Sequence, residues 1–315
     1  MQIELLGGWF FFAMLAPVVW AMATILDVWL VGSGVYSRAI DGAIISASFS
    51  SLPLLAMLPS IQVANIAAYP AIISFIAGVF FYFHTLYFLK ALFALNDAAS
   101  ADSIDTLSVV VVPVLAFLLL GDVLVIQHYL AILCSAMGCF IIACGYLNKT
   151  SGNALVFSLL SVLFVSMATV SQAFALSKNS YETSVAIFSV SVLLCGLVSA
   201  ICYHSFRKRI GVIIRRFGLL FISAECLQQG AMLSSQRATQ LAPSVSVVKV
   251  AECTSPLFVL LFSAAAIRLV GRRTCTPDIN ALQYALGQQL SNLPLKLTAV
   301  LFISLGVCLV YLAPT

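Results

Sequence analysis

Long apolar stretches separated by short polar connections run through the whole chain. Because about 20 apolar residues are needed to cross the hydrocarbon core of a bilayer, each stretch predicts a membrane-spanning helix. Ten such helices are expected, over residues 9–32, 42–60, 70–94, 102–121, 126–147, 153–177, 183–204, 214–236, 244–270 and 296–313. Little of the chain is left outside them, so the pattern predicts an all-α integral membrane protein.

The same succession of apolar segments is written twice. A methionine that precedes alanine and threonine, a proline inside an apolar run and a glycine near the end of each half recur in the same order. The matched positions are Met22 and Met167, Pro113 and Pro256, and Gly138 and Gly306. Their separations are 145, 143 and 168 residues, so the spacing is nearly constant until the last connection, which is about 25 residues longer in the second half. This order predicts a duplication.

The duplication defines two domains. The first five-helix repeat spans residues 9–147, and the second spans 153–313. Because five is an odd number, the second repeat enters the membrane with the opposite orientation, and inverted repeats are typical of secondary transporters. In the longer last connection, residues 271–294 carry apolar side chains at helical spacing. They predict an amphipathic helix on the membrane surface, either an ordinary connection or a gate or partner contact.

Composition excludes an ordinary soluble domain. Hydrophobic residues make up 62% of the chain and charged residues 8%, with a mean hydropathy of +1.11. Eight of the nine cysteines lie inside predicted spans, and Cys275 has no partner in a connection. We therefore expect no disulfide, and the cysteine spacing matches no metal-binding motif. No nucleotide-binding motif is found, so transport driven by ATP is not expected. We also expect no metal and no cofactor.

Basic residues are distributed unevenly among the connections. The net charge is +4, and the odd-numbered connections hold ten lysines and arginines against two in the even-numbered ones. By the positive-inside rule, the odd connections face the cytoplasm and both termini lie outside. The basic cluster at residues 207–216 is typical of a topology signal or a lipid headgroup contact, and no nucleic-acid partner is expected.

Several apolar motifs resemble a known family. They are Val112-Pro113-Val114-Leu115, Leu120-Gly121-Asp122 and Gly138 in the first half, Ser255-Pro256-Leu257-Phe258 and Leu305-Gly306-Val307 in the second, and Trp20-Ala21 followed by Asp27 in the first span. Together they are similar to the drug/metabolite transporter superfamily, and within it to the ten-span members built from two EamA repeats. The resemblance covers nearly the whole chain and implies a transporter of the bacterial inner (plasma) membrane.

The chain departs from this family at two points. The family has an acidic residue after each proline-containing helix. This residue is Asp122 in the first copy, whereas the second copy carries Arg268 and Arg272 in this region. The ten-span members usually keep both termini in the cytoplasm, which is opposite to the orientation that the basic residues predict.

Ionisable side chains inside spans are costly, so each is a candidate functional group. In the ninth span, Lys249 and Glu252 lie three residues apart on one helical face, just before Pro256. The equivalent fourth span carries Asp102 and Asp105 before its own proline. Two interpretations are open. Lys249 and Glu252 neutralise each other, or Lys249 pairs with Asp105 across a central cavity and the pair holds the carboxylate and ammonium of a solute.

Two polar stripes occupy equivalent spans. They are formed by His84, Tyr87 and Lys90 in the third span and by Glu225, Gln228, Gln229, Met232 and Gln236 in the eighth. The number of ionisable groups exceeds what helix packing requires, so the stripes favour a shared aqueous cavity. Interhelical hydrogen bonding is the alternative.

The first and sixth spans add two further candidates. Trp20 lies in mid-span, where it either stacks on a solute or fills the bundle. Gln172 aligns with Asp27, which is itself expected to pair with a neighbouring helix. The candidate solute-binding residues are therefore Trp20, His84, Tyr87, Lys90, Asp105, Gln172, Glu225, Gln228, Gln229, Lys249 and Glu252.

These features favour a secondary transporter that moves a small polar or zwitterionic, amino-acid-like metabolite by alternating access. If transport is driven, we expect coupling to protons through Glu252, Asp105 or Glu225, because a carboxylate shielded from water can exchange a proton near neutral pH. Facilitated diffusion is the alternative. A second transporter hypothesis is an exporter of nucleotide derivatives, drugs or lipid-linked sugars.

An enzyme is not expected. The sequence has no zinc-protease motif, nucleophile elbow or recognisable aspartyl-protease pair, so no catalytic residue is predicted. An intramembrane enzyme is the alternative from a different functional class. The expected partners are the solute, the lipid bilayer and, for driven transport, protons, and the protein is expected to be a monomer or a weak dimer.

Overall fold

The chain forms a bundle of long helices in a computed structural model, which describes residues 2–32, 38–61, 66–95, 98–147, 152–270 and 293–313. No strand occurs within these ranges. The helices are α1 (Gln2–Gly32), α2 (Ala39–Phe49), α3 (Ser51–Met57), η1 (Leu58–Ser60), α4 (Ala68–Leu95), α5 (Ala98–Asp105), α6 (Ser108–Leu120), α7 (Ile126–Leu147), α8 (Gly152–Lys178), α9 (Tyr181–Cys202), α10 (His204–Leu241), α11 (Val245–Glu252), α12 (Ser255–Val270) and α14 (Leu293–Leu312).

Nine stretches of helix in the described part of the chain are long and apolar enough to cross a membrane. They coincide with nine of the ten predicted spans, which confirms an all-α membrane protein. The eighth predicted span, 214–236, lies within α10, whose more polar sequence keeps it out of this set. The predicted surface segment at 271–294 lies almost wholly outside the described residues.

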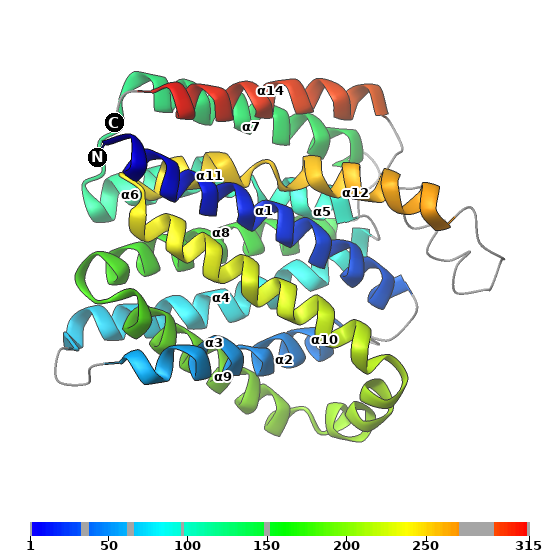
Figure 1. Ribbon diagram of the computed structural model, residues 1–315. Helices are drawn as coiled ribbons and strands as arrows, with labels where there is room; N and C mark the ends of the chain where they lie inside the picture. The colour runs from blue at the N-terminus through cyan, green and yellow to red at the C-terminus, as the bar shows by residue number, and fades with distance from the viewer. Residues whose placement is uncertain are drawn as a thin grey trace.

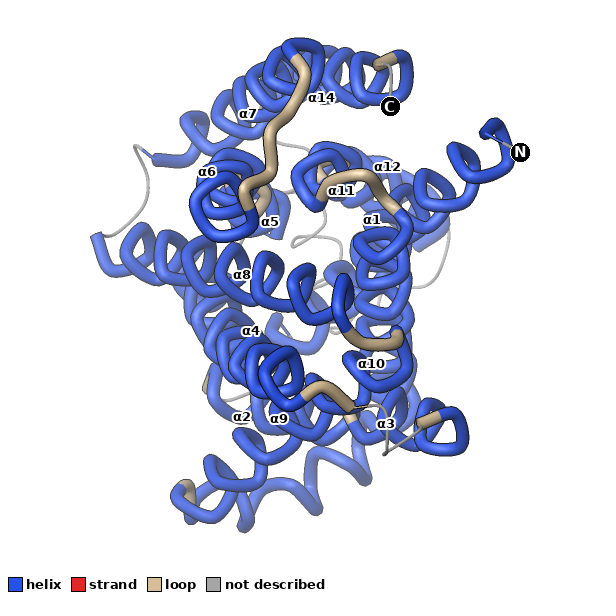
Figure 2. The backbone as a smooth tube through the Cα atoms, turned by 90° about the vertical axis from the view of Figure 1, so that its left-hand side faces the viewer, coloured by secondary structure: helices blue, strands red, loops and turns tan. Residues whose placement is uncertain are grey.

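The helices are arranged in long pairwise contacts. α1 packs along α10, α4 along α8, and α7 along α14. Both termini lie at the same end of the bundle (Figure 1). Figure 2 views the bundle nearly along its helix axes and shows α7 and α14 at one side, α2 and α9 at the opposite side, and α8 and α1 between them. In this view the short helices α5, α6, α11 and α12 lie between the α7 and α14 pair and the helices α8 and α1.

Two of the predicted spans are broken within their first half. The first break falls between α5 and α6 at Thr106, whose hydroxyl donates to the Ser103 carbonyl at 2.9 Å. The second falls between α11 and α12 at Thr254, whose hydroxyl donates to the Ala251 carbonyl at 2.7 Å. Pro256 follows the second break directly, and because proline has no N–H it cannot continue the helical hydrogen bonds. At both breaks, backbone N–H groups such as those of Leu107 and Thr254 donate to the carbonyl three residues earlier, so the chain passes each break in a tight turn.

The contact between α7 and α14 depends on two glycines, which approach the opposite helix in the same way. A Cβ at Gly138 would lie 2.7 Å from the carbonyl oxygen of Ala299 and 2.6 Å from Ile303. A Cβ at Gly306 would lie 2.8 Å from the carbonyl oxygen of Ala131 and would collide with the Ser135 hydroxyl. Each glycine thus meets the residues seven and three positions before the other glycine, so the two helices run antiparallel.

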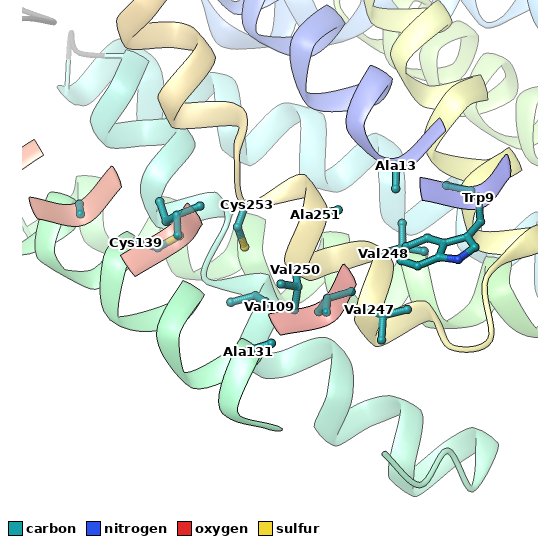
Figure 3. Packing of buried hydrophobic residues seen from close by; sticks show 14 of the residues in the cluster. Trp9, Ala13, Val109, Ala131, Cys139, Val247, Val248, Val250, Ala251 and Cys253 are labelled. Carbon is teal, nitrogen blue, oxygen red and sulfur yellow. The ribbon is translucent and has the colours of Figure 1, made fainter. Parts of the chain in front are cut away.

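A buried apolar cluster joins this helix pair to the broken helices. Figure 3 shows Ala131 and Cys139 of α7 close to Val109 of α6 and to Val250 of α11. All four residues are fully buried. The cluster packs on one side of both breaks, and Asp105, Lys249 and Glu252 of the broken helices line a cavity.

Candidate functional site

A central cavity lies between the broken helices and the long helices α1, α4, α8 and α10. Its volume is about 140 Å³, which corresponds to roughly ten water molecules when each occupies about 10–15 Å³ of such space. Eight of the eleven predicted solute-binding residues line it: Trp20, His84, Asp105, Gln172, Glu225, Gln228, Lys249 and Glu252. The cavity therefore brings together residues from six separate stretches of the sequence.

Lys249 and Glu252 form a buried ion pair at the second helix break. The Lys249 Nζ lies 2.6 Å from Glu252 Oε2, and the two residues are 8% and 5% exposed. Ser235 of α10 donates a hydrogen bond to the other oxygen of Glu252. The structure thus pairs Lys249 with Glu252 of its own helix and not with Asp105. Both partners also line the cavity, so their mutual neutralisation is compatible with contact to a solute.

Asp105 is held by two other helices at the first break. Its Oδ1 accepts a hydrogen bond from Ser161 of α8 at 2.7 Å and lies 3.5 Å from the Nδ1 of His84 on α4. The Ser161 oxygen is also 2.9 Å from His84 Nδ1. Because a hydroxyl has one proton and Ser161 gives it to Asp105, the hydrogen on the imidazole must be on Nδ1. Nε2 of a neutral His84 is then an acceptor.

The two breaks touch each other beside these charges. The Cys253 thiol donates to the carbonyl oxygen of Thr106 at 3.6 Å, and both residues line the cavity. Asp102 and Ser255 lie next to each other across the two breaks. Asp102 is 9% exposed, and its Oδ2 has no hydrogen-bond partner in the described part of the chain. We call His84, Asp102, Asp105, Lys249 and Glu252 the ionic centre.

A second group of carboxylates lines the cavity away from the ionic centre. Asp27 of α1 lies close to Glu225 of α10, and Ser46 of α2 lies beside Glu225. Asp27 was expected to pair with a neighbouring helix, and the neighbour that it meets is another acid. We call Asp27 and Glu225 the acidic pole.

Amide side chains close the polar lining between α8 and α10. Gln172 Nε2 donates to Gln236 Oε1 at 3.0 Å, and Ser74 Oγ of α4 lies 2.9 Å from Gln172 Oε1. All three residues are buried. Gln172 is thus tied to two helices at once, and its amide orientation is set by these contacts.

Three predicted residues do not line the cavity: Tyr87, Lys90 and Gln229. Lys90 Nζ lies 4.7 Å from the centroid of the Tyr87 ring and 5.4 Å from that of Phe157 on α8. Tyr87 in turn stacks on Phe164 with centroids 5.6 Å apart. Each residue turns a helix by about 100°, so Lys90 lies roughly 120° around α4 from His84. Three-residue spacing therefore did not keep the stripe on one face.

Lys90 gives a test of which face of α4 matters. We expect Lys90→Met to leave solute transport within twofold of the wild-type rate, because the ammonium group contacts aromatic rings outside the cavity. The loss of the cation–π contacts should cost about 0.5–2 kcal/mol of stability. Transport assays in liposomes and thermal unfolding measure the two effects, and a loss of transport with unchanged stability would bring Lys90 back into the site.

Sequence reasoning missed several residues that complete the site. Ser161 and Ser235 hold the two carboxylates Asp105 and Glu252, and Ser46 lies beside Glu225. Serines are frequent in the spans, and only the packing of other helices distinguishes these three. No group of three or more metal-ligating side chains is placed to hold a metal ion in the described ranges.

Comparisons with known proteins bear on the fold alone. No family model matches the chain, and no curated protein matches it. A solved structure described as "Crystal structure of protein" superimposes with a TM-score of 0.58 at 14% sequence identity, covering 93% of this chain and 99% of that chain. At this identity, the likeness indicates a shared arrangement of helices over nearly the full length of both chains.

Proposed function

We propose that the protein is a secondary transporter for a small polar solute. The observation that carries the proposal is the central cavity, where two broken helices bring buried charges together inside an otherwise apolar helix bundle. Broken helices in membrane transporters supply free backbone groups to a binding site near the middle of the bilayer. Charges buried at this depth are expensive unless they serve a solute or an ion.

Inverted repeats over residues 9–147 and 153–313 are part of this proposal, and three features support them. The fourth and ninth predicted spans are both broken, at Thr106 and Thr254. The contact of α1 with α10 has its counterpart in the contact of α8 with α4. Gly138 and Gly306 contact each other's helices at equivalent positions. The contacted residues, Ala299 and Ile303 against Ala131 and Ser135, are offset by the same 168 residues as the two glycines. A two-fold relation between two five-helix units explains all three, with α10 as the tenth span.

The ionic centre favours an amino-acid-like solute. It presents both signs of charge within one cavity, through Lys249 on one side and the carboxylates of Asp102, Asp105 and Glu252 on the other. Room for roughly ten waters suits a compact metabolite better than a large amphipathic cargo. We place the protein in the drug/metabolite transporter superfamily and in the bacterial inner membrane on the resemblance of its motifs. If transport is driven, protons are the proposed coupling ion, carried by Glu252, Asp105 or Glu225.

The proposal is tested with the purified protein. A thermal-shift screen against amino acids, amines and small acids should find a compound that stabilises the protein. That compound, in labelled form, should then exchange across the membrane of proteoliposomes in a counterflow assay at least tenfold above empty liposomes. Recovery of a chemically altered product would indicate an intramembrane enzyme, and stabilising compounds that never cross the bilayer would indicate a receptor.

A further inference from the structure

The acidic pole is a pair of carboxylates, Glu225 buried and Asp27 half-buried, for which the described part of the chain gives no positive partner. Glu225 is 4% exposed, and its Oε2 has no hydrogen-bond partner in the described residues. The ion pairs of Lys249 with Glu252 and of His84 with Asp105 join other groups, and Glu225 lies near the carboxylate of Asp27. Buried polar atoms in proteins are almost always satisfied. An unsatisfied carboxylate oxygen at a cavity wall is therefore suited to a ligand that donates a hydrogen bond.

The charge balance of the whole cavity gives the sign of that ligand. The lining contains five carboxylates, Asp27, Asp102, Asp105, Glu225 and Glu252, against Lys249 and His84. Lys249 forms an ion pair with Glu252, and His84 lies beside Asp105. Neither positive group forms its ion pair with Asp27 or Glu225. A cavity with an excess of one sign of charge attracts the opposite sign.

The other groups at the pole suit an ammonium group. Trp20, Thr24 and Asp27 follow one face of α1 and all line the cavity, as does Ser46 beside Glu225. An ammonium has three N–H donors and no acceptor, so two carboxylates and a hydroxyl can satisfy it. An indole ring can add a cation–π contact to the same group.

We propose that Asp27 and Glu225 bind the ammonium group of the transported solute, and that the protein selects a small organic cation over the corresponding zwitterion. This inference rests on the proposed transport function and keeps its small polar solute, but it replaces the amino-acid-like zwitterion with an amine that carries no carboxylate. The carboxylate of a zwitterion would be repelled by the unpaired acids of the cavity, whereas a neutral polar group would not be repelled.

A series of four-carbon compounds tests the inference because its members differ mainly in charge. The probes are 4-amino-1-butanol, 4-aminobutanoate and 1,4-butanediol, with sodium chloride as the inorganic cation, all at constant ionic strength. We expect 4-amino-1-butanol to raise the unfolding temperature at concentrations at least tenfold lower than the other three. Equal effects of the zwitterion or the diol, or stabilisation by sodium alone, would overturn the inference.

Substitutions at the pole locate the effect. Glu225→Gln and Asp27→Asn should each weaken binding of 4-amino-1-butanol at least tenfold, and Glu225→Asp should restore most of it. Glu182→Gln, which removes a carboxylate from α9 outside the cavity lining, is the matched control and should bind normally. Glu225→Gln should also unfold at a higher temperature than the wild type without ligand, because it removes a buried charge that has no partner. Unchanged binding in both pole variants would contradict the proposal.

Transport separates this inference from the function on which it rests. Counterflow of a zwitterion that is insensitive to Glu225→Gln would preserve the transporter and refute the acidic pole as its binding site. Binding of 4-amino-1-butanol that needs Glu225, without exchange across the bilayer, would preserve the cation site and refute transport.

Discussion

Gly306→Val should prevent α7 and α14 from packing and give a protein that does not survive purification as a monodisperse species. The side chain would have to enter the space filled by the Ser135 hydroxyl and the Ala131 carbonyl oxygen. Backbone atoms of a packed helix cannot rotate away as a side-chain tip can, so the helices must separate. Overpacking inside a core typically costs about 1–3 kcal/mol, and contact with backbone places this change at the upper end.

A milder series makes the test quantitative. Gly306→Ala and Gly138→Ala should each lower the unfolding temperature by roughly 5 °C or more. Gly230→Ala is the matched control, because a Cβ at Gly230 of α10 meets no atom within 4 Å. Alanine is favoured over glycine inside a helix by about 0.5–1 kcal/mol, so this variant should be unchanged or slightly more stable. Equal tolerance of all three substitutions would show that the two helices do not approach as closely as described.

The same two glycines show how much a duplicated sequence can predict. Their order along the chain predicted equivalent places in two repeats, and the structure gives them equivalent contacts on opposite helices. The helix positions also followed from sequence, because a span of apolar residues is a strong and local signal. Breaks within the spans were not predicted, since Pro256 lies at its break but Pro113 lies within α6, well past the break at Thr106.

Contacts between helices explain which site predictions could be made. The Lys249 and Glu252 pair follows from spacing along one helix, so the sequence contains it. The grouping of Asp105 with His84 and Ser161 joins three helices, and no spacing along the chain encodes it. The neighbour of Asp27 is likewise set by how α1 packs on α10.

Lys249→Met should abolish transport and also destabilise the protein strongly. The change leaves Glu252 buried with Ser235 as its remaining partner. Breaking a buried ion pair by removing one member costs about 3–5 kcal/mol, whereas replacing both members with apolar residues is often neutral or stabilising. Transport in liposomes and thermal unfolding of the purified variants measure the two effects. Lys178→Met, which removes an exposed lysine at the end of α8, is the control and should change neither.

The double variant Lys249→Met/Glu252→Met separates the two roles of this pair. Its stability should return to within about 1 kcal/mol of the wild type, because no unpaired charge is left in the bundle. Transport should remain at least 100-fold below the wild-type rate, since the cavity has lost the groups that distinguish a solute by charge. If transport returned together with stability, the pair would serve only to neutralise itself, and the solute would be held by the other groups of the cavity. A stable but inactive double variant would place both residues in the binding site.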